Sequence, residues 1–318
     1  MSIRSILPEE FLPAYYWRCV RQSVDLEGAR LDIKPLDAAQ WKSEKALGRI
    51  FTSVLDWTQL SASDLVRLHT FLPARMPVQL ANCDKSVSSL FSTRRYVGFA
   101  ARHDTRVMRL CEDCLAEDRR ALGIAYWKRH HQIPGVHRCL KHRSPLVECI
   151  GEDVVKLSPR GATISEAVET RRAPFASTKY PLVGRFAKVC ELLLATLREP
   201  LDRFVVSNAV CKRSTQVLNW YPDTPNKLHH LVHGRVPERW IRDIRGHNRS
   251  GVLRDKRWID LQLHVRGTGH HWGLALVLAA MWSDPNEAIS DLYRALANPP
   301  DRPTLKDIRA RRAVVSTQ

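Results

Sequence analysis

Two short pairs of metal-ligand residues constrain this chain more than any other feature of its sequence. Cys111 and Cys114 form a C-x2-C pair, Cys139 and His142 form a C-x2-H pair, and 24 residues (115–138) separate the pairs. A two-residue gap lets one tight turn direct two side chains at the same ion, and four such ligands complete the tetrahedral shell of zinc. The spacing therefore predicts a Zn²⁺ site. Because protein groups fill all four positions, the predicted role of the metal is structural and not catalytic.

The residues around the two pairs fit a small metal-stabilised module. The apolar residues 107–110 predict a strand that leads into Cys111, and residues 136–138 predict a second strand that leads into Cys139. A module of this size buries little core. Metal binding, at about 10–16 kcal/mol, would supply the missing folding free energy.

The insert between the pairs predicts two short helices. Glu117 and Asp118 lie early in the first helix, where acidic groups suit the positive N-terminus, and Gly123 is placed to end it. Residues 124–132 predict the second helix. Cys149 is the best alternative fourth ligand, and His130 and His137 also flank the module, but the two-residue spacing favours His142. A weaker second metal site would use histidines at helical spacing: His229, His230 and His233.

The same stretch resembles a known family. The segments that carry the resemblance are Arg109-x-Cys111-x2-Cys114-Leu115, Glu117-Asp118, Gly123, Tyr126-Trp127, His131-Gln132-x-Pro134-Gly135-Val136 and Cys139-x2-His142. Together they resemble the TniQ family of target-selection proteins of bacterial transposons. Weaker likenesses precede the module, at Leu7-Pro8-Glu9-Glu10, His69-Thr70 and Leu72-Pro73.

The resemblance implies a non-catalytic adaptor in DNA transposition. Such a protein marks the insertion site and recruits the transposon AAA+ ATPase, which in turn brings in the transposase. It either reads target DNA directly or docks, in some cases as a homodimer, on a CRISPR effector complex whose guide RNA selects the sequence. The length of 318 residues and the single Cys/His quartet favour docking. The alternative is a zinc-stabilised protein that itself reads a DNA sequence, either as an attachment-site reader or as a transcription regulator.

Charge and composition indicate a polyanion partner and a cytoplasmic location, which the resemblance implies is that of a bacterium. Fifty Lys and Arg residues against 33 Asp and Glu give a net charge of +17, which favours DNA or RNA as a partner. The first 16 residues lack the apolar run of a signal peptide, so the eight cysteines are expected to be reduced or metal-bound. The longest apolar run, residues 273–282, is about half a membrane span and predicts a core helix.

Arginines interleaved with tryptophans mark the candidate nucleic-acid or partner contacts. A helix beginning near Pro237 would turn Trp240, Ile241 and Ile244 inward and its arginines outward. Guanidinium groups bind phosphate well, although the same pattern fits a protein interface or a solvated face. The candidate residues are Arg94, Arg95, Arg239, Arg242, Arg245, Arg249, Arg254, Lys256 and Arg257.

Catalytic motifs do not emerge from the sequence, so the chain is predicted not to be an enzyme. It contains neither a phosphate-loop motif nor HExxH, and no carboxylate cluster can be assigned to two-metal chemistry. The enzymatic rival would be a metal-dependent nuclease. The cysteines outside the module are expected to be small buried apolar groups: Cys19, Cys83, Cys190 and Cys211.

The predicted fold class is mainly α, with a helix-turn-helix-like N-terminal domain, a small zinc-ribbon-like module and a C-terminal helical domain. Ser61 and Asp64 resemble a helix-capping pair, and Pro181 opens a helix with an apolar stripe. Two last helices are expected at residues 270–282 and 287–297. The predicted boundaries are an N-terminal domain at 1–100, the module at 101–150, a linker at 151–180, the C-terminal domain at 181–300 and a basic tail at 301–318.

Overall fold

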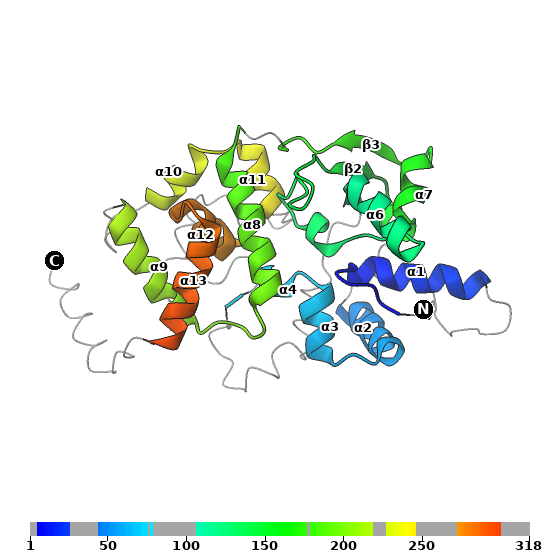
Figure 1. The fold of residues 1–318 in the computed structure, drawn as a ribbon, viewed down its shortest axis with the longest axis horizontal. Coiled ribbons are helices and arrows are strands. Elements are labelled where there is room, and N and C mark those ends of the chain that lie inside the picture. The colour runs from blue at the N-terminus through cyan, green and yellow to red at the C-terminus, as the bar shows by residue number, and fades with distance from the viewer. Residues whose placement is uncertain are drawn as a thin grey trace.

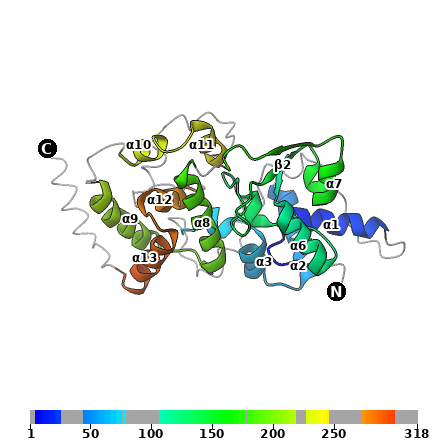
Figure 2. The ribbon, with the colours of Figure 1, turned by 45° about the horizontal axis from the view of Figure 1, so that its top comes forward.

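The computed structural model describes residues 5–25, 44–75, 77–78, 106–176, 179–218, 227–245 and 272–299. Helices dominate this part of the chain, and one three-stranded antiparallel sheet lies among them, which confirms the predicted fold class. Figure 1 shows the N-terminal helices and the sheet on one side of the molecule and the C-terminal helices on the other. Helix α8 lies at the boundary between the two sides in both ribbon views (Figure 2).

The described residues of the N-terminal part contain the helices α1 (Leu12–Asp25), α2 (Glu44–Thr58), α3 (Ala62–His69) and α4 (Leu72–Arg75). A three-residue turn joins α2 to α3, as in a helix-turn-helix. The Ser61 side chain accepts a hydrogen bond from the Asp64 backbone N–H at 3.0 Å, so the predicted cap of α3 is confirmed. Buried aromatic residues of α1, among them Tyr15 and Tyr16, anchor this helix in the core.

The module with the Cys and His pairs is built from β1 (Val107–Leu110), α6 (Glu112–Leu122), the 3₁₀ helix η3 (Arg129–Gln132) and β2 (Val147–Ile150). Strand β1 pairs antiparallel with β2, so that Met108 lies opposite Cys149. Gly123 ends α6 in the left-handed conformation with φ of 75°, as predicted for the residue that terminates this helix.

Two local predictions within the module are wrong. Residues 136–138 do not form a strand, because only Arg138 makes a bridge, to Pro145, in the tight hairpin that carries Cys139. Residues 124–132 do not form a second α-helix, and only the 3₁₀ turn η3 lies there. Its side chains serve tertiary contacts: Arg129, His131 and Gln132 are all buried. Tertiary packing therefore determines the conformation of residues 124–132, and the local helical pattern does not.

The segment 151–180, predicted as an irregular linker, is more ordered than its sequence indicates. It contains the 3₁₀ helix η4 (Val154–Lys156), α7 (Pro159–Ile164) and β3 (Glu169–Arg172). Strand β3 extends the sheet by pairing with β2, and Arg171 forms an ion pair with Glu148 at 3.1 Å. The side chains of β3 are all exposed, which removes the apolar alternation by which a strand is recognised in a sequence.

The C-terminal part is a helical assembly around α8 (Pro181–Thr196). Helix α8 packs against α12 (Gly273–Met281) and α13 (Pro285–Ala297), and its buried stripe of Phe186, Val189, Cys190 and Leu193 is the predicted one. Every residue of α12 is buried, so the apolar run is a core helix as expected. The remaining helices are α9 (Arg203–Leu218), α10 (Lys227–His233) and α11 (Glu238–Arg245).

A buried guanidinium joins the module to the N-terminal helices and to α8. Arg129 is 1% exposed, and its Nε and Nη2 atoms donate to the Glu9 carboxylate at 2.5 and 2.8 Å. Its Nη1 donates to the carbonyl oxygens of Arg67 and Thr70, and Nη2 also reaches the Leu194 carbonyl at 3.5 Å. One side chain thus bonds to Glu9 in the segment before α1, to α3, to the α3–α4 turn and to α8.

A second set of contacts, made by Trp240, packs α11 against the module. The Trp240 indole N–H donates to the Gly135 carbonyl at 2.8 Å, and its ring meets Phe186 of α8 edge-on with centroids 5.4 Å apart. Gly135 has φ of +82°, and a Cβ at this position would lie 2.6 Å from Ile244 Cγ1. Both the backbone conformation and the close approach of α11 therefore require glycine here.

We expect Arg129→Ala to lower the free energy of unfolding by about 3 kcal/mol, because buried carbonyls and the Glu9 carboxylate lose their donor. The matched control is Arg198→Ala, since Arg198 is exposed and should change stability by about 0.5 kcal/mol or less. Urea unfolding followed by circular dichroism measures both variants. Equal unfolding midpoints for the two variants would contradict the assigned role of Arg129.

Candidate metal centre

The four predicted ligands come from two chain segments that the fold brings face to face. Cys111 directly follows β1 and is the N-cap of α6 in an extended conformation, with φ of −108° and ψ of 126°. Cys114 follows in the first turn of α6, so both sulfurs lie on the same side of the helix start. Cys139 and His142 lie on the hairpin opposite. There Arg143 adopts φ of 56°, and its N–H donates to the Cys139 carbonyl at 2.8 Å.

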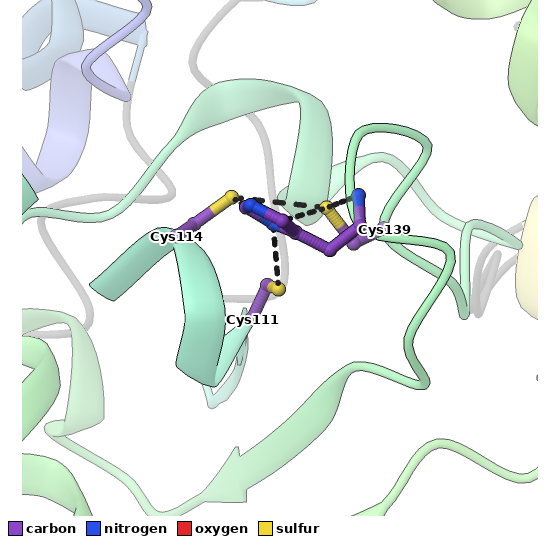
Figure 3. A group of neighbouring side chains, drawn as sticks. Cys111, Cys114 and Cys139 are labelled. Atoms are coloured by element: carbon purple, nitrogen blue, oxygen red, sulfur yellow. Dashed lines mark hydrogen bonds between the residues drawn. The ribbon is translucent and has the colours of Figure 1, made fainter. Parts of the chain in front are cut away.

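The distances among the ligand atoms match a tetrahedral metal site. All four atoms lie within 4.8 Å of one another (Figure 3). His142 Nδ1 is 3.5 Å from the Cys111 sulfur, 3.3 Å from the Cys114 sulfur and 3.7 Å from the Cys139 sulfur, and the last two sulfurs are 3.7 Å apart. Ligands about 2.0–2.3 Å from a central ion stand roughly 3.3–3.8 Å apart at the corners of a tetrahedron. These four distances therefore fit ligands arranged around one central metal ion.

Glu117 fixes which nitrogen of His142 faces the cluster. His142 Nε2 lies 3.0 Å from Glu117 Oε1, whose other oxygen accepts from Lys141 Nζ. A proton on Nε2 satisfies the carboxylate and leaves the Nδ1 lone pair directed at the sulfurs. Carboxylates commonly hold metal-bound imidazoles in this way and make the imidazole a stronger ligand.

The closely spaced sulfurs perturb one another when no metal is bound. The neighbouring thiols of Cys114 and Cys139 hold the pKa of Cys111 far below its ordinary value, and Cys111 in turn raises the pKa of Cys114 and of Cys139. Ser144 Oγ, 3.2 Å from the Cys111 sulfur, adds to the lowering. One thiolate is thus ready to attract a cation, and the remaining thiols release protons when the metal binds.

The charges around His142 follow from the same hydrogen bonds. The hydrogen bond to Glu117 raises the pKa of His142, while Lys141 and then His142 lower the pKa of Glu117. Metal binding at Nδ1 requires the neutral imidazole, so the metal competes with a proton there. Burial lowers the pKa of the nearby His130 and His137 to about 4 and about 3, which keeps both neutral.

The alternative ligands lie away from the cluster. Cys149 is fully buried on β2, and burial raises the pKa of its thiol to about 11. His137 packs edge-on against Phe175, with its Nε2 4.0 Å from Asp243 of α11. The rings of His229 and His233 have centroids 3.9 Å apart and are tilted by 46°, yet the quartet is the only group of three or more suitable ligands among the described residues.

The structure describes two of the predicted nucleic-acid contacts in full. Arg239 and Arg242 are exposed on α11, whereas Trp240, Ile241 and Ile244 are buried, as the helical pattern predicts. Arg245 ends the same helix. The other candidates lie outside the described residues: Arg94, Arg95, Arg249, Arg254, Lys256 and Arg257.

The contribution of Glu117 is a feature that sequence reasoning missed. Its early place in α6 was attributed to the electrostatics of the helix N-terminus, but the residues of the first turn are Glu112 and Asp113. The available signal was spacing. Glu117 follows Cys114 by three residues, so both side chains emerge from one helix face.

Fold and site together define a mainly helical protein organised around a Cys₃His module able to hold a metal ion. Residues 6–146 match the family described as TniQ, and the match spans the N-terminal helices and all four ligands. This region of the chain is thus similar to the TniQ family, which is associated with target selection in transposition. No curated protein matches the chain significantly in sequence. None of the helices in the described residues combines the length and apolar character needed to cross a bilayer.

We expect Cys114→Ser to lose the bound metal, because one of the four ligands becomes a weakly coordinating hydroxyl. The module should then be destabilised, since the binding free energy contributes to folding. Elemental analysis of the purified protein measures the metal, and Cys211→Ser, a half-buried cysteine outside the module, is the control that should retain it. A Cys114→Ser protein that keeps a full equivalent of metal would refute the ligand assignment.

We expect Glu117→Ala to weaken metal affinity about 10- to 100-fold without removing a ligand, because the imidazole loses its orienting carboxylate. Competition with a chromophoric chelator measures the affinity. Glu112→Ala is the matched control, since Glu112 is exposed on the same helix. Indistinguishable affinities for the two variants would exclude a positioning role for Glu117.

Proposed function

We propose that the protein is a non-catalytic target-site selector in DNA transposition, with a structural Zn²⁺ held by Cys111, Cys114, Cys139 and His142. The match of residues 6–146 to the TniQ family carries the proposal. The ligand set supports zinc, because three thiolates and one imidazole at tetrahedral spacing are the ligands that structural zinc sites use. With four protein ligands, the metal shapes the module and has no open position for a substrate.

Contact with target DNA is proposed for the outer face of α11. Its inner face is anchored to the module and to α8, so the exposed guanidinium groups of Arg239 and Arg242 project from a rigid support. Phosphate binding at this face is supported by the net charge of +17. Contacts to phosphate give affinity and orientation but carry no sequence information.

Sequence choice would then come from another component. We propose that the protein docks on a CRISPR effector complex, where guide RNA selects the site, and recruits the AAA+ ATPase and through it the transposase. The TniQ-family match supports transposon proteins as partners. A homodimer is one assembly that this role allows, and the bacterial cytoplasm is where it would act.

The alternative, direct reading of an attachment sequence or a promoter, predicts different binding. A direct reader should bind one duplex with nanomolar affinity at moderate salt and reject scrambled duplexes. The proposed adaptor should bind all duplexes alike and lose affinity steeply as salt rises. Co-purification with the ATPase and the guide-RNA complex tests the partners, and cleavage of DNA in the presence of Mg²⁺ or Mn²⁺ would overturn the non-catalytic proposal.

We expect Arg239→Ala combined with Arg242→Ala to reduce the slope of log affinity against log salt by about 2, because each phosphate contact contributes about 1. Fluorescence anisotropy with a labelled duplex measures the slope. The matched control replaces Arg119 and Arg120, two exposed arginines at the end of α6, by Ala. If both double variants change the slope equally, α11 is not the DNA-binding face.

A further inference from the structure

A polar groove lies between α9 and α13, in the C-terminal part of the molecule. Its volume is about 470 Å³, and residues of α9 and α13 supply most of its lining. Both helices lie on the side of the molecule away from the module (Figures 1 and 2). This volume falls within the range of sites that take small ligands or a few residues of a peptide. Neither the metal cluster nor the exposed face of α11 contributes to it.

Basic groups outnumber acidic groups in the lining. Lys212 and Arg213 contribute from α9 and Arg294 from α13, against the single carboxylate of Asp291. That carboxylate is already engaged, because it accepts from Arg294 Nη1 at 2.7 Å and from the Trp282 indole N–H at 2.9 Å. Lys212 is exposed and forms no ion pair with any of the described residues. The groove therefore presents a net positive charge to an incoming group.

The base of the groove is already ordered. The Arg213 guanidinium lies over the Trp282 ring, 5.3 Å from its centroid, and its Nε donates to the Met281 carbonyl at 3.4 Å. Trp282 is 2% exposed, and its N–H bond to Asp291 ties the end of α12 to α13. A ligand would meet a preorganised surface, which reduces the entropic cost of binding.

The remaining lining favours a peptide over a nucleic acid. Three carboxamides, from Asn208, Gln216 and Asn298, can pair with both the N–H and C=O groups of an extended backbone. Small apolar side chains lie between them. Single-stranded nucleic acids need exposed aromatic faces for their bases, but Trp282 is buried beneath Arg213.

We propose that this groove binds an acidic segment of a partner protein. Carboxylates of the segment pair with Lys212 and Arg294 at the rim, and its backbone pairs with the carboxamides. The chain's own C-terminal residues 301–318 do not complement the groove, because they are rich in Lys and Arg. The inference goes beyond the proposed function, since it depends neither on the metal nor on DNA contact by α11.

The test uses the full-length protein and a fluorescein-labelled nonapeptide in which Glu alternates with Ala. Anisotropy should show saturable binding, and Lys212→Glu combined with Arg294→Glu should weaken it at least tenfold. The matched control is Arg239→Glu combined with Arg242→Glu, which changes the net charge equally and should leave peptide binding within about twofold. Metal content and circular dichroism check that both variants are folded.

Three outcomes would overturn the proposal. The first is no binding of the acidic peptide by the unaltered protein, and the second is equal binding of a peptide with Gln in place of Glu. The third is a labelled single-stranded DNA whose affinity falls with the α9–α13 variant and not with the α11 variant, which would assign the groove to nucleic acid. If α11 does not bind DNA, the Arg239→Glu and Arg242→Glu control will not change DNA binding, but the result for the acidic peptide stays the same. The peptide proposal and the DNA proposal can therefore fail separately.

Discussion

The buried Arg129 guanidinium is the interaction on which the arrangement of the module depends. Taking this charge out of water is costly, and the cost is offset only if its donors are satisfied. Glu9 and backbone carbonyls from three other parts of the chain do so. The partners are separated from Arg129 by as many as 120 residues. The hydrogen bonds of this one guanidinium therefore fix the segment before α1, helix α3 and helix α8 relative to the module.

The metal cluster is not the only interaction that stabilises the module. Small zinc modules are often unfolded without metal because they bury too little apolar surface. Here Cys111, Cys114 and Cys139 are buried in an apolar core that is continuous with α1 and with the C-terminal helices. The neighbouring helices thus share the task of holding the module. A bound metal would fix the hairpin of Cys139 and His142 against the start of α6, in addition to the hydrogen bonds that join Glu117 of α6 to His142 and Lys141.

The sequence allowed prediction of features whose cause is local. The Cys and His pairs were predictable because two-residue spacing sets ligand geometry, as were the Ser61 cap and the apolar stripe of α8. Features set by distant contacts were not. Helix α9 was missed because Ser207 and Ser214 are buried on it beside its valines, which blurs the apolar stripe. The exposed strand β3 and the role of Arg129 likewise depend on partners far along the chain.

Helix α8 connects the two proposed binding surfaces, the arginine face of α11 and the groove between α9 and α13. It contacts α4, α12 and α13 directly, and Phe186 on the same helix meets Trp240 of α11. The arginine face of α11 and the groove of α9 and α13 are thus both connected to α8, through Trp240 and through α13. Close-packed interiors have low compressibility. The two surfaces should therefore keep a fixed separation, which suits a protein that holds DNA and a second protein at a set spacing without changing shape.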